Sequence, residues 1–325
     1  MAAVFSDIWH DVIPDLLPLL KQAFGYSEFR DGQHAVIEAT LQGHDSFVLM
    51  PTGGGKSLCY QLPALMLPNV TLVVSPLMSL MKDQVDALQA NGIAAEFVNS
   101  SLSREQVMQV FSRLRRGEIK LLYVAPERLL QPQFIQRLRD VGVSLFAIDE
   151  AHCISQWGHD FRPDYMALTL IRQLFPQVPV MALTATADSA TRQDIVQQLS
   201  LQQAYVHLGS FDRPNIRYTV QEKFRAVDQL VSYLQQQDGA SGIVYCGSRR
   251  KVDELTEQLK QRGFNAAAYH AGLSSDERNL VQDAFKRDDY QLIVATVAFG
   301  MGVNKSNIRY VVHFELPRTI EAYYQ

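Results

Sequence analysis

Cysteine is scarce in this chain of 325 residues: it has only Cys59, Cys153 and Cys246, which lie far apart. An odd number of widely spaced cysteines fits neither a disulfide framework nor a zinc site, so we expect reduced, buried thiols and no bound zinc. Long apolar runs are also missing, since no window approaches the roughly 18 unbroken apolar residues that cross a bilayer. The N-terminus lacks the basic segment of a signal peptide. These absences predict a cytoplasmic protein without a membrane anchor.

A surplus of positive charge is missing as well, because the formal net charge is −4 and the pI is about 6.1. This balance argues against a protein that coats nucleic acid through its overall charge. A local basic groove could still bind a phosphate backbone. Apolar residues make up 47% of the chain, which is enough for a full core, and the length favours two domains.

Short apolar runs rich in β-branched residues alternate with helical patterns along nearly the whole chain. Such runs suit parallel strands covered on both faces, with helices as the crossovers. The expected strands are Phe47–Met50, Leu72–Ser75, Leu121–Ala125, Leu145–Ile148, Val180–Leu183, Ile243–Cys246, Ala266–Tyr269, Leu292–Ala295 and Tyr310–Phe314. Turn formers break the pattern near Gly209–Tyr218. The sequence therefore predicts the α/β class with two parallel sheets: an N-terminal extension (1–20), a first lobe (21–208) and a second lobe (209–325).

Three glycines followed by Lys56 and Ser57 separate the first expected strand from a helix. Glycines let a backbone fold around phosphates, and the N–H groups at a helix N-terminus face the anion. Lys56 would reach the β- and γ-phosphates of ATP, and the Ser57 hydroxyl would bind Mg²⁺. The expected nucleotide-binding residues of this loop are Thr52, Gly53, Gly54, Gly55, Lys56 and Ser57. The alternative is an ordinary glycine-rich turn followed by a chance Lys-Ser pair.

Asp149 and Glu150 follow the expected strand Leu145–Ile148, at the edge where parallel sheets bind ligands. Asp149 would hold Mg²⁺ through water, and Glu150 would act as the general base toward the attacking water. Alone, such a pair is weak evidence for a site, because an ordinary solvated turn at a strand end has the same residues. Together with the phosphate loop, it predicts a site for ATP and Mg²⁺.

The chain contains, in this order, the segments MPTGGGKS, SPLMSLMKDQ, APERL, DEAHCISQWGHDFRPDY, LTATA and ATVAFGMG. This order resembles the RecQ family of superfamily-2 DNA helicases from about residue 18 to the end. The resemblance implies two tandem RecA-like domains of the P-loop NTPase type, the second one incomplete. It also accounts for Met50, which stands where the general phosphate-loop pattern has glycine.

The resemblance implies further roles for individual residues. Gln33 would bind the adenine edge with Arg30 nearby, and Tyr26 would stack on the ring. His152 would be a hydrogen-bonding switch rather than a metal ligand, reaching the second lobe or the coupling motif Thr184-Ala185-Thr186. That motif is otherwise an ordinary strand end. The DNA-binding residues that the family resemblance implies are Lys82, Arg128, Trp157, His159, Phe161, Arg162, Ser248 and Arg249.

The segment Trp157–Arg162 by itself suggests binding to single-stranded nucleic acid, because aromatic rings beside an arginine form a stacking platform for bases. The alternative is a surface loop that buries its rings in the core. The resemblance implies a monomeric 3′→5′ DNA helicase that binds single-stranded and partial-duplex DNA, serves repair and recombination, and lies in the cytoplasm at a bacterial nucleoid. Rival functions are an RNA helicase and a nucleotide-gated DNA clamp.

The chain stops at Gln325, whereas the resemblance places an arginine finger and zinc-binding and winged-helix regions beyond that point. An arginine finger stabilises the charge of the transferring phosphoryl group. We therefore expect slow ATP turnover and no detectable strand separation from these residues alone.

Overall fold

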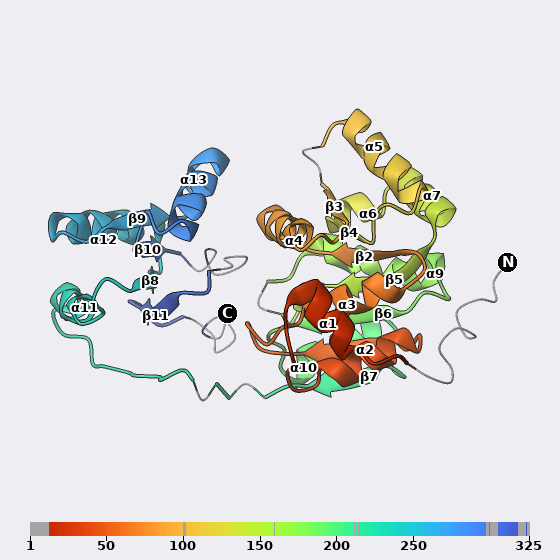
Figure 1. Cartoon of the computed structure of the whole chain (residues 1–325). Coiled ribbons are helices and arrows are strands. Elements are labelled where there is room, and N and C mark those ends of the chain that lie inside the picture. The colour runs from red at the N-terminus through yellow and green to blue at the C-terminus, as the bar shows by residue number, and fades with distance from the viewer. Residues whose placement is uncertain are drawn as a thin grey trace. The chain divides into compact units, whose positions relative to one another are not determined.

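The computed structural model describes residues 13–99, 102–158, 160–210, 212–213, 215–296, 299, 305–317 and 323 (Figure 1). The chain divides into two compact units, Met1–Arg213 and Pro214–Gln325. Each unit contains one parallel sheet with helices packed against it, so the predicted α/β fold with two parallel sheets is confirmed. No helix among the described residues is long and apolar enough to cross a membrane.

Unit 1 contains a seven-stranded parallel sheet of order β3-β4-β2-β5-β6-β1-β7. Its strands are β1 (Ser46–Leu49), β2 (Val70–Val74), β3 (Ala95–Val98), β4 (Leu121–Val124), β5 (Val143–Ile148), β6 (Val180–Thr184) and β7 (Tyr205–Leu208). The connections are the helices α1 (Leu17–Phe24), α2 (Gln33–Leu41), α3 (Leu58–Met66), α4 (Met78–Ala90), α5 (Arg104–Arg115), α6 (Pro126–Leu129), α7 (Pro132–Val141), α8 (Pro163–Met166), α9 (Ile171–Leu174) and α10 (Ser189–Gln198), with 3₁₀ turns at Ala151–Ile154 and Ala167–Leu170.

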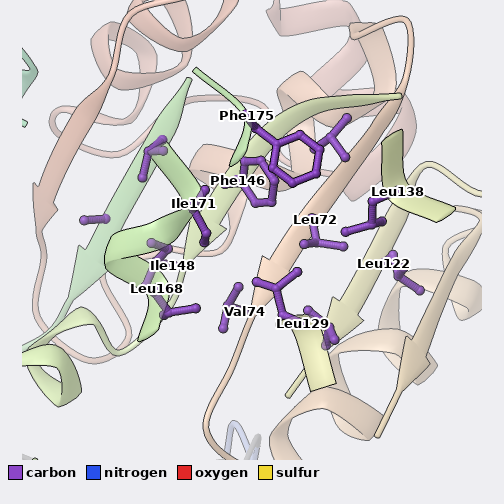
Figure 2. Close-up of a cluster of buried hydrophobic side chains, with 14 of the residues drawn as sticks. Leu72, Val74, Leu122, Leu129, Leu138, Phe146, Ile148, Leu168, Ile171 and Phe175 are labelled. Atoms are coloured by element: carbon purple, nitrogen blue, oxygen red, sulfur yellow. The ribbon is translucent and has the colours of Figure 1, made fainter. Parts of the chain in front are cut away.

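Both faces of this sheet are buried, because neighbouring residues of one strand belong to different core clusters. In β2, Leu72 and Val74 pack with α5, α7 and α10, whereas Val73 packs with α1 to α4. Figure 2 shows the first cluster, in which the Phe146 and Phe175 rings lie 5.1 Å apart. Burial on both faces explains why the central strands are continuous apolar runs.

Two strands of unit 1 were not predicted, β3 and β7. They are the edges of the sheet, and their sequences mix polar and apolar residues, as in Glu96 and His207. The described part of the expected N-terminal extension packs on unit 1. Leu16 and Leu20 are 1% and 0% exposed and belong to the core of unit 1.

Unit 2 contains a smaller parallel sheet of order β11-β8-β10-β9. Its strands are β8 (Ser241–Tyr245), β9 (Ala266–Tyr269), β10 (Leu292–Ala295) and β11 (Ile308–His313), and its helices are α11 (Ala226–Gln235), α12 (Arg249–Gln261) and α13 (Ser275–Lys286). Helices α11 and α12 contribute to one core cluster, and α13 contributes to another through Phe285. Within each unit the strands are parallel, so the loops that leave their carboxyl ends lie at one edge of that unit's own sheet.

Candidate nucleotide and nucleic-acid site

The phosphate loop connects β1 to α3 and depends on glycine at two positions. Gly53 and Gly55 have φ angles of 77° and 87°, in the left-handed region that other residues avoid. A Cβ atom on Gly55 would lie 2.2 Å from Nε2 of Gln33, so any side chain there would displace the Gln33 amide. The glycine run therefore serves both the backbone turn and a close contact with α2.

Side chains from the first residue of α2 and from the segment before it hold the carbonyl groups of this loop. Nε2 of Gln33 donates to the Gly55 and Gly54 carbonyls at 3.1 and 3.4 Å, and the Arg30 guanidinium donates to the Gly53 carbonyl. Oε1 of Gln33 accepts from the Arg30 N–H at 2.8 Å, and the Gln33 side chain is only 2% exposed. Tyr26 is 55% exposed. Of the three residues expected near adenine, Arg30 and Gln33 thus brace the phosphate loop.

Two more cations contact the loop. Nη1 of Arg213, a contact that the sequence did not predict, donates to the Thr52 carbonyl at 2.5 Å. Nζ of Lys56 donates to the Met50 carbonyl at 3.3 Å. The Lys56 charge also opposes the rise in the pKa of both Asp149 and Glu150, so it lies within electrostatic reach of the acidic pair.

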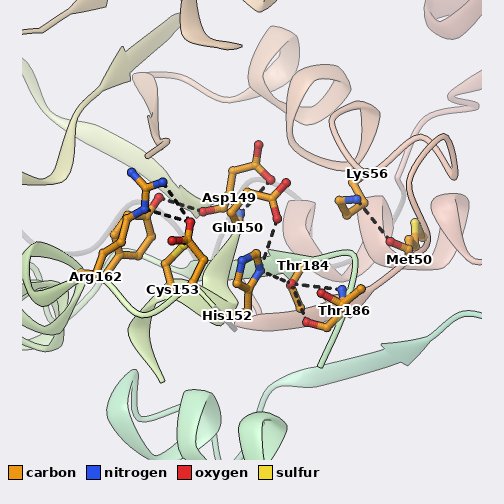
Figure 3. Close-up of polar contacts among 11 residues, drawn as sticks. Met50, Lys56, Asp149, Glu150, His152, Cys153, Arg162, Thr184 and Thr186 are labelled. Atoms are coloured by element: carbon orange, nitrogen blue, oxygen red, sulfur yellow. Dashed lines mark hydrogen bonds and ion pairs between the residues drawn. The ribbon is translucent and has the colours of Figure 1, made fainter. Parts of the chain in front are cut away.

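Asp149 and Glu150 follow the carboxyl end of β5 (Figure 3). Asp149 is 8% exposed; its Oδ1 accepts from the Glu150 N–H at 3.0 Å, and its carbonyl accepts from the Tyr165 hydroxyl at 3.0 Å. Burial raises the pKa of Asp149 and raises that of Glu150 to about 7, with the Asp149 charge as the second cause for Glu150. Two desolvated carboxyl groups side by side form a site that a cation stabilises.

His152 connects the acidic pair to the end of β6. Its Nδ1 lies 3.3 Å from Oε2 of Glu150 and 2.9 Å from Oγ1 of Thr184 (Figure 3). The Thr184 hydroxyl donates to the Thr186 carbonyl at 3.1 Å, so it accepts from Nδ1–H of His152. Of the two expected partners of His152, the described contact is with the threonine motif.

The loop after the acidic pair turns its aromatic side chains outward. Trp157 is 75% exposed and Phe161 is 37% exposed, so these rings do not lie in the core. A Cβ atom on Gly158 would lie 2.3 Å from the His152 carbonyl, which shows how closely the loop folds against the turn that follows the acidic pair. Arg162 donates to Asp160 at 2.9 and 3.1 Å and to the Pro76 carbonyl at 3.0 Å. The loop therefore contacts both the acidic pair's own turn and the segment after β2.

Two family models match this chain: the DEAD/DEAH box helicase model over residues 30–195 and the helicase conserved C-terminal domain over residues 222–325. The ATP-dependent DNA helicase RecQ of Pasteurella multocida is 58% identical over 95% of this chain and 49% of its own length. The chain belongs to the RecQ group of the DEAD/DEAH box helicases. A probable ATP-dependent DNA helicase RecS of Bacillus subtilis is 48% identical over 94% of this chain and 62% of its own length.

This RecQ-group chain spans about half the length of its first curated relatives. Its fold is also that of the DUF1998 helicase MrfA bound to DNA and AMPPNP, with a TM-score of 0.74 and 17% identity over 95% of this chain and 48% of the other. At that identity the likeness shows the fold alone. The family membership implies ATP as the nucleotide of the RecQ-group site.

The RecQ-group site also includes a compact set of possible metal ligands, His152, Cys153 and Asp160, whose atoms lie within 4.8 Å of one another. These groups already have other partners. Asp160 binds Arg162, and Nδ1 of His152 contacts Thr184. Burial, followed by the Asp160 charge, raises the pKa of the Cys153 thiol above its ordinary value, which disfavours the thiolate that binds metals.

The other residues expected to bind DNA lie in both units. In unit 1, Lys82 is exposed on α4, and Arg128 is partly buried on α6. In unit 2, Ser248 caps α12 by accepting from the Lys251 N–H at 3.4 Å, and Arg249 begins that helix and is exposed. His159 lies outside the described residues.

Proposed function

We propose that this chain is the motor core of an ATP-dependent 3′→5′ DNA helicase. The observation that carries the proposal is the sheet edge of unit 1, where the braced phosphate loop, the Asp149–Glu150 pair and the His152–Thr184 contact occur together. Separate parts of such an edge are common, but this combination suits phosphoryl transfer from a nucleoside triphosphate to water.

In this proposal ATP binds to the loop with its phosphates facing the N-terminus of α3. Lys56 would leave the Met50 carbonyl and bind the β- and γ-phosphates. Ser57 and Asp149 would hold Mg²⁺, which neutralises charge on the phosphates when bound. The fit rests on the desolvated carboxyl groups, whose raised pKa values a cation would lower.

Glu150 would accept a proton from the attacking water, and its pKa of about 7 is close to the range that suits a general base. His152 would report the state of Glu150 to Thr184, because its ring contacts both side chains. Tyr26, Arg30 and Gln33 would form the adenine side of the site.

Single-stranded DNA would stack on Trp157 and Phe161, and its phosphates would meet Arg162 and Lys82 of unit 1. The implied contacts in Arg128, His159, Ser248 and Arg249 belong to the same proposal. We further propose that the substrate is partial-duplex DNA and that the chain serves repair and recombination. In this proposal the protein is a monomer in the bacterial cytoplasm, at the nucleoid. The metal that we propose for this site is Mg²⁺ and not zinc.

Phosphate release from Mg-ATP tests this function, measured alone, with single-stranded DNA and with single-stranded RNA of the same sequence. We expect slow hydrolysis that DNA stimulates. Stimulation by RNA but not by DNA would instead identify an RNA helicase. Nucleotide-dependent DNA affinity without any phosphate release would identify a clamp. For direction, a longer chain with the full length of the relatives should unwind duplexes with 3′ overhangs and not those with 5′ overhangs.

A further inference from the structure

A polar network joins two helices of unit 1. Helix α3 starts at the phosphate loop, and helix α4 carries Lys82, which is proposed to bind DNA. Nε2 of Gln61, on α3, donates to Oε1 of Gln84, on α4, at 2.8 Å and to the Tyr123 hydroxyl at 3.2 Å. The Tyr123 hydroxyl lies 3.5 Å from that of Tyr60 and donates to it. Gln61 is 8% exposed, and both tyrosines are 1% exposed or less. Three of these four connected polar side chains are buried, and Gln84 is half-buried.

The network reaches the phosphate loop through Tyr60. Burial raises the pKa of Tyr60 far above its ordinary value, and a hydrogen bond with the Ser57 side chain acts in the opposite direction. Burial likewise raises the pKa of Tyr123. Both hydroxyls thus stay protonated, and the Tyr123 hydroxyl remains the donor to Tyr60. The contacts run without a break from Ser57, at the start of α3, to Gln84.

The far end of the network is a helix that the proposed function assigns to DNA. Helix α4 starts just after the Ser75–Leu77 segment and exposes Lys82, whereas Gln84 on the same helix faces inward to Gln61. Apolar contacts tolerate small sliding of one helix on another. Hydrogen bonds between buried groups are directional, and an unmade one is costly, so they permit few relative positions of α3 and α4.

We propose that the Gln61–Gln84 hydrogen bond is a positioning contact that couples nucleotide binding at the phosphate loop to DNA binding on α4. The inference rests on the proposed function, and it adds the means by which one site of unit 1 affects the other. Both glutamines act through neighbouring groups and touch neither ligand. Coupling between two sites is reciprocal, so DNA must change nucleotide affinity by the same factor as nucleotide changes DNA affinity.

The test measures binding and needs no hydrolysis. A fluorescent non-hydrolysable ATP analogue is titrated with Mg²⁺ in the absence and presence of saturating single-stranded DNA, and the DNA is titrated in the reverse experiment. We expect the two ligands to change each other's affinity by about fivefold or more in the unchanged chain. In Gln61→Met and in Gln84→Met, each ligand alone should bind within about twofold of normal, and the coupling factor should fall to near one.

Gln89→Met is the matched control, because Gln89 lies on the same helix and donates to the Ala95 carbonyl, outside α3, at 2.9 Å. It should keep the full coupling factor. The double variant Gln61→Met/Gln84→Met should lose no more coupling than either single variant, since both remove the same contact. Additive losses would show that the glutamines act separately and would overturn the proposal.

Stability is followed by thermal unfolding, so that a variant that fails to fold is recognised. Gln84→Met alters the less buried partner and keeps the test available if Gln61→Met does not fold. An unchanged chain that binds neither probe would refute the proposed function itself. Binding of both probes without coupling would refute only this inference, as would a loss of nucleotide affinity in Gln61→Met with the coupling factor unchanged.

Discussion

The acidic pair and the aromatic loop lie next to each other in the chain but are held in opposite ways. Glu150 has a left-handed φ of 49° and lies against His152, whose side chain is 1% exposed. Only a few residues later, Trp157 is 75% exposed. The structure therefore holds the groups proposed for chemistry against protein neighbours, and leaves the ring proposed to bind DNA exposed to solvent.

Variants of the buried groups and of the exposed groups should therefore behave differently. Removing one of the buried groups should lower the rate of hydrolysis, because its interactions stabilise the transition state more than they stabilise bound ATP. Removing a protruding group should lower DNA affinity or stimulation and leave basal hydrolysis intact. Measurements of hydrolysis and of DNA affinity in variants therefore show on which side of this division a residue falls.

Glu150→Gln should have the largest effect. Loss of a general base lowers hydrolysis by about 10²–10⁴-fold, while binding of a non-hydrolysable ATP analogue should persist. The unchanged chain should lose activity as the pH falls, because protonation removes the base; without Mg²⁺ the midpoint of this protonation is about 7. Bound Mg²⁺ should move that midpoint to lower pH. Steady-state rates between pH 5.5 and 8.5 check this, and an unchanged rate in the variant would remove Glu150 from the mechanism.

Lys56→Ala should lower hydrolysis by about 10²–10³-fold, since a cation aimed at the developing phosphate charge is lost. Nucleotide affinity should fall as well. Lys21→Ala, an exposed lysine on α1, is the matched control and should hydrolyse ATP normally. Equal losses in both variants would mean that net charge, and not position at the phosphate loop, sets the rate.

The same acidic pair should also cost stability at high pH. The folded pKa of Glu150, about 7, exceeds its ordinary value of 4.5, so the stabilisation is complete below about pH 4.5 and is lost as the pH rises through 7. Glu150→Gln should therefore be more stable than the unchanged chain at pH 8 without Mg²⁺, by on the order of 1–3 kcal/mol. Denaturant unfolding at pH 5 and pH 8 measures the difference, which should shrink at pH 5.

How much of this site could be read from the sequence depends on the range of each contact. The phosphate loop and the central strands follow from local patterns, such as Leu121–Ala125 for β4. The adenine-side role of Gln33 came only from resemblance. The Arg213 contact with Thr52 and the Gln61 contact with Tyr123 join residues 161 and 62 positions apart, and no local pattern encodes such a pairing.

Trp157→Ala tests the protruding side of the division. Stacking of one base on an aromatic ring contributes about 1–3 kcal/mol, so DNA affinity and DNA stimulation should fall by roughly tenfold. Basal hydrolysis should stay within about twofold, because exposed side chains away from packed contacts contribute little to stability. Met108→Ala, which removes another exposed apolar side chain of unit 1, should change neither quantity. An equal loss of basal hydrolysis would place Trp157 on the side of the buried groups.

The smallest effect should separate two helix caps of unit 2. Ser274 accepts from the Glu277 N–H at 3.2 Å, and Glu277 binds back to Ser274 at 2.8 Å, whereas Ser248 makes one long contact to Lys251. Loss of a good cap costs about 1 kcal/mol, so Ser274→Ala should lower unfolding stability more than Ser248→Ala. DNA affinity should respond in the reverse order if Ser248 contacts the backbone. Because stability and affinity are expected to change in opposite order, a common cause such as partial unfolding of unit 2 cannot produce both results.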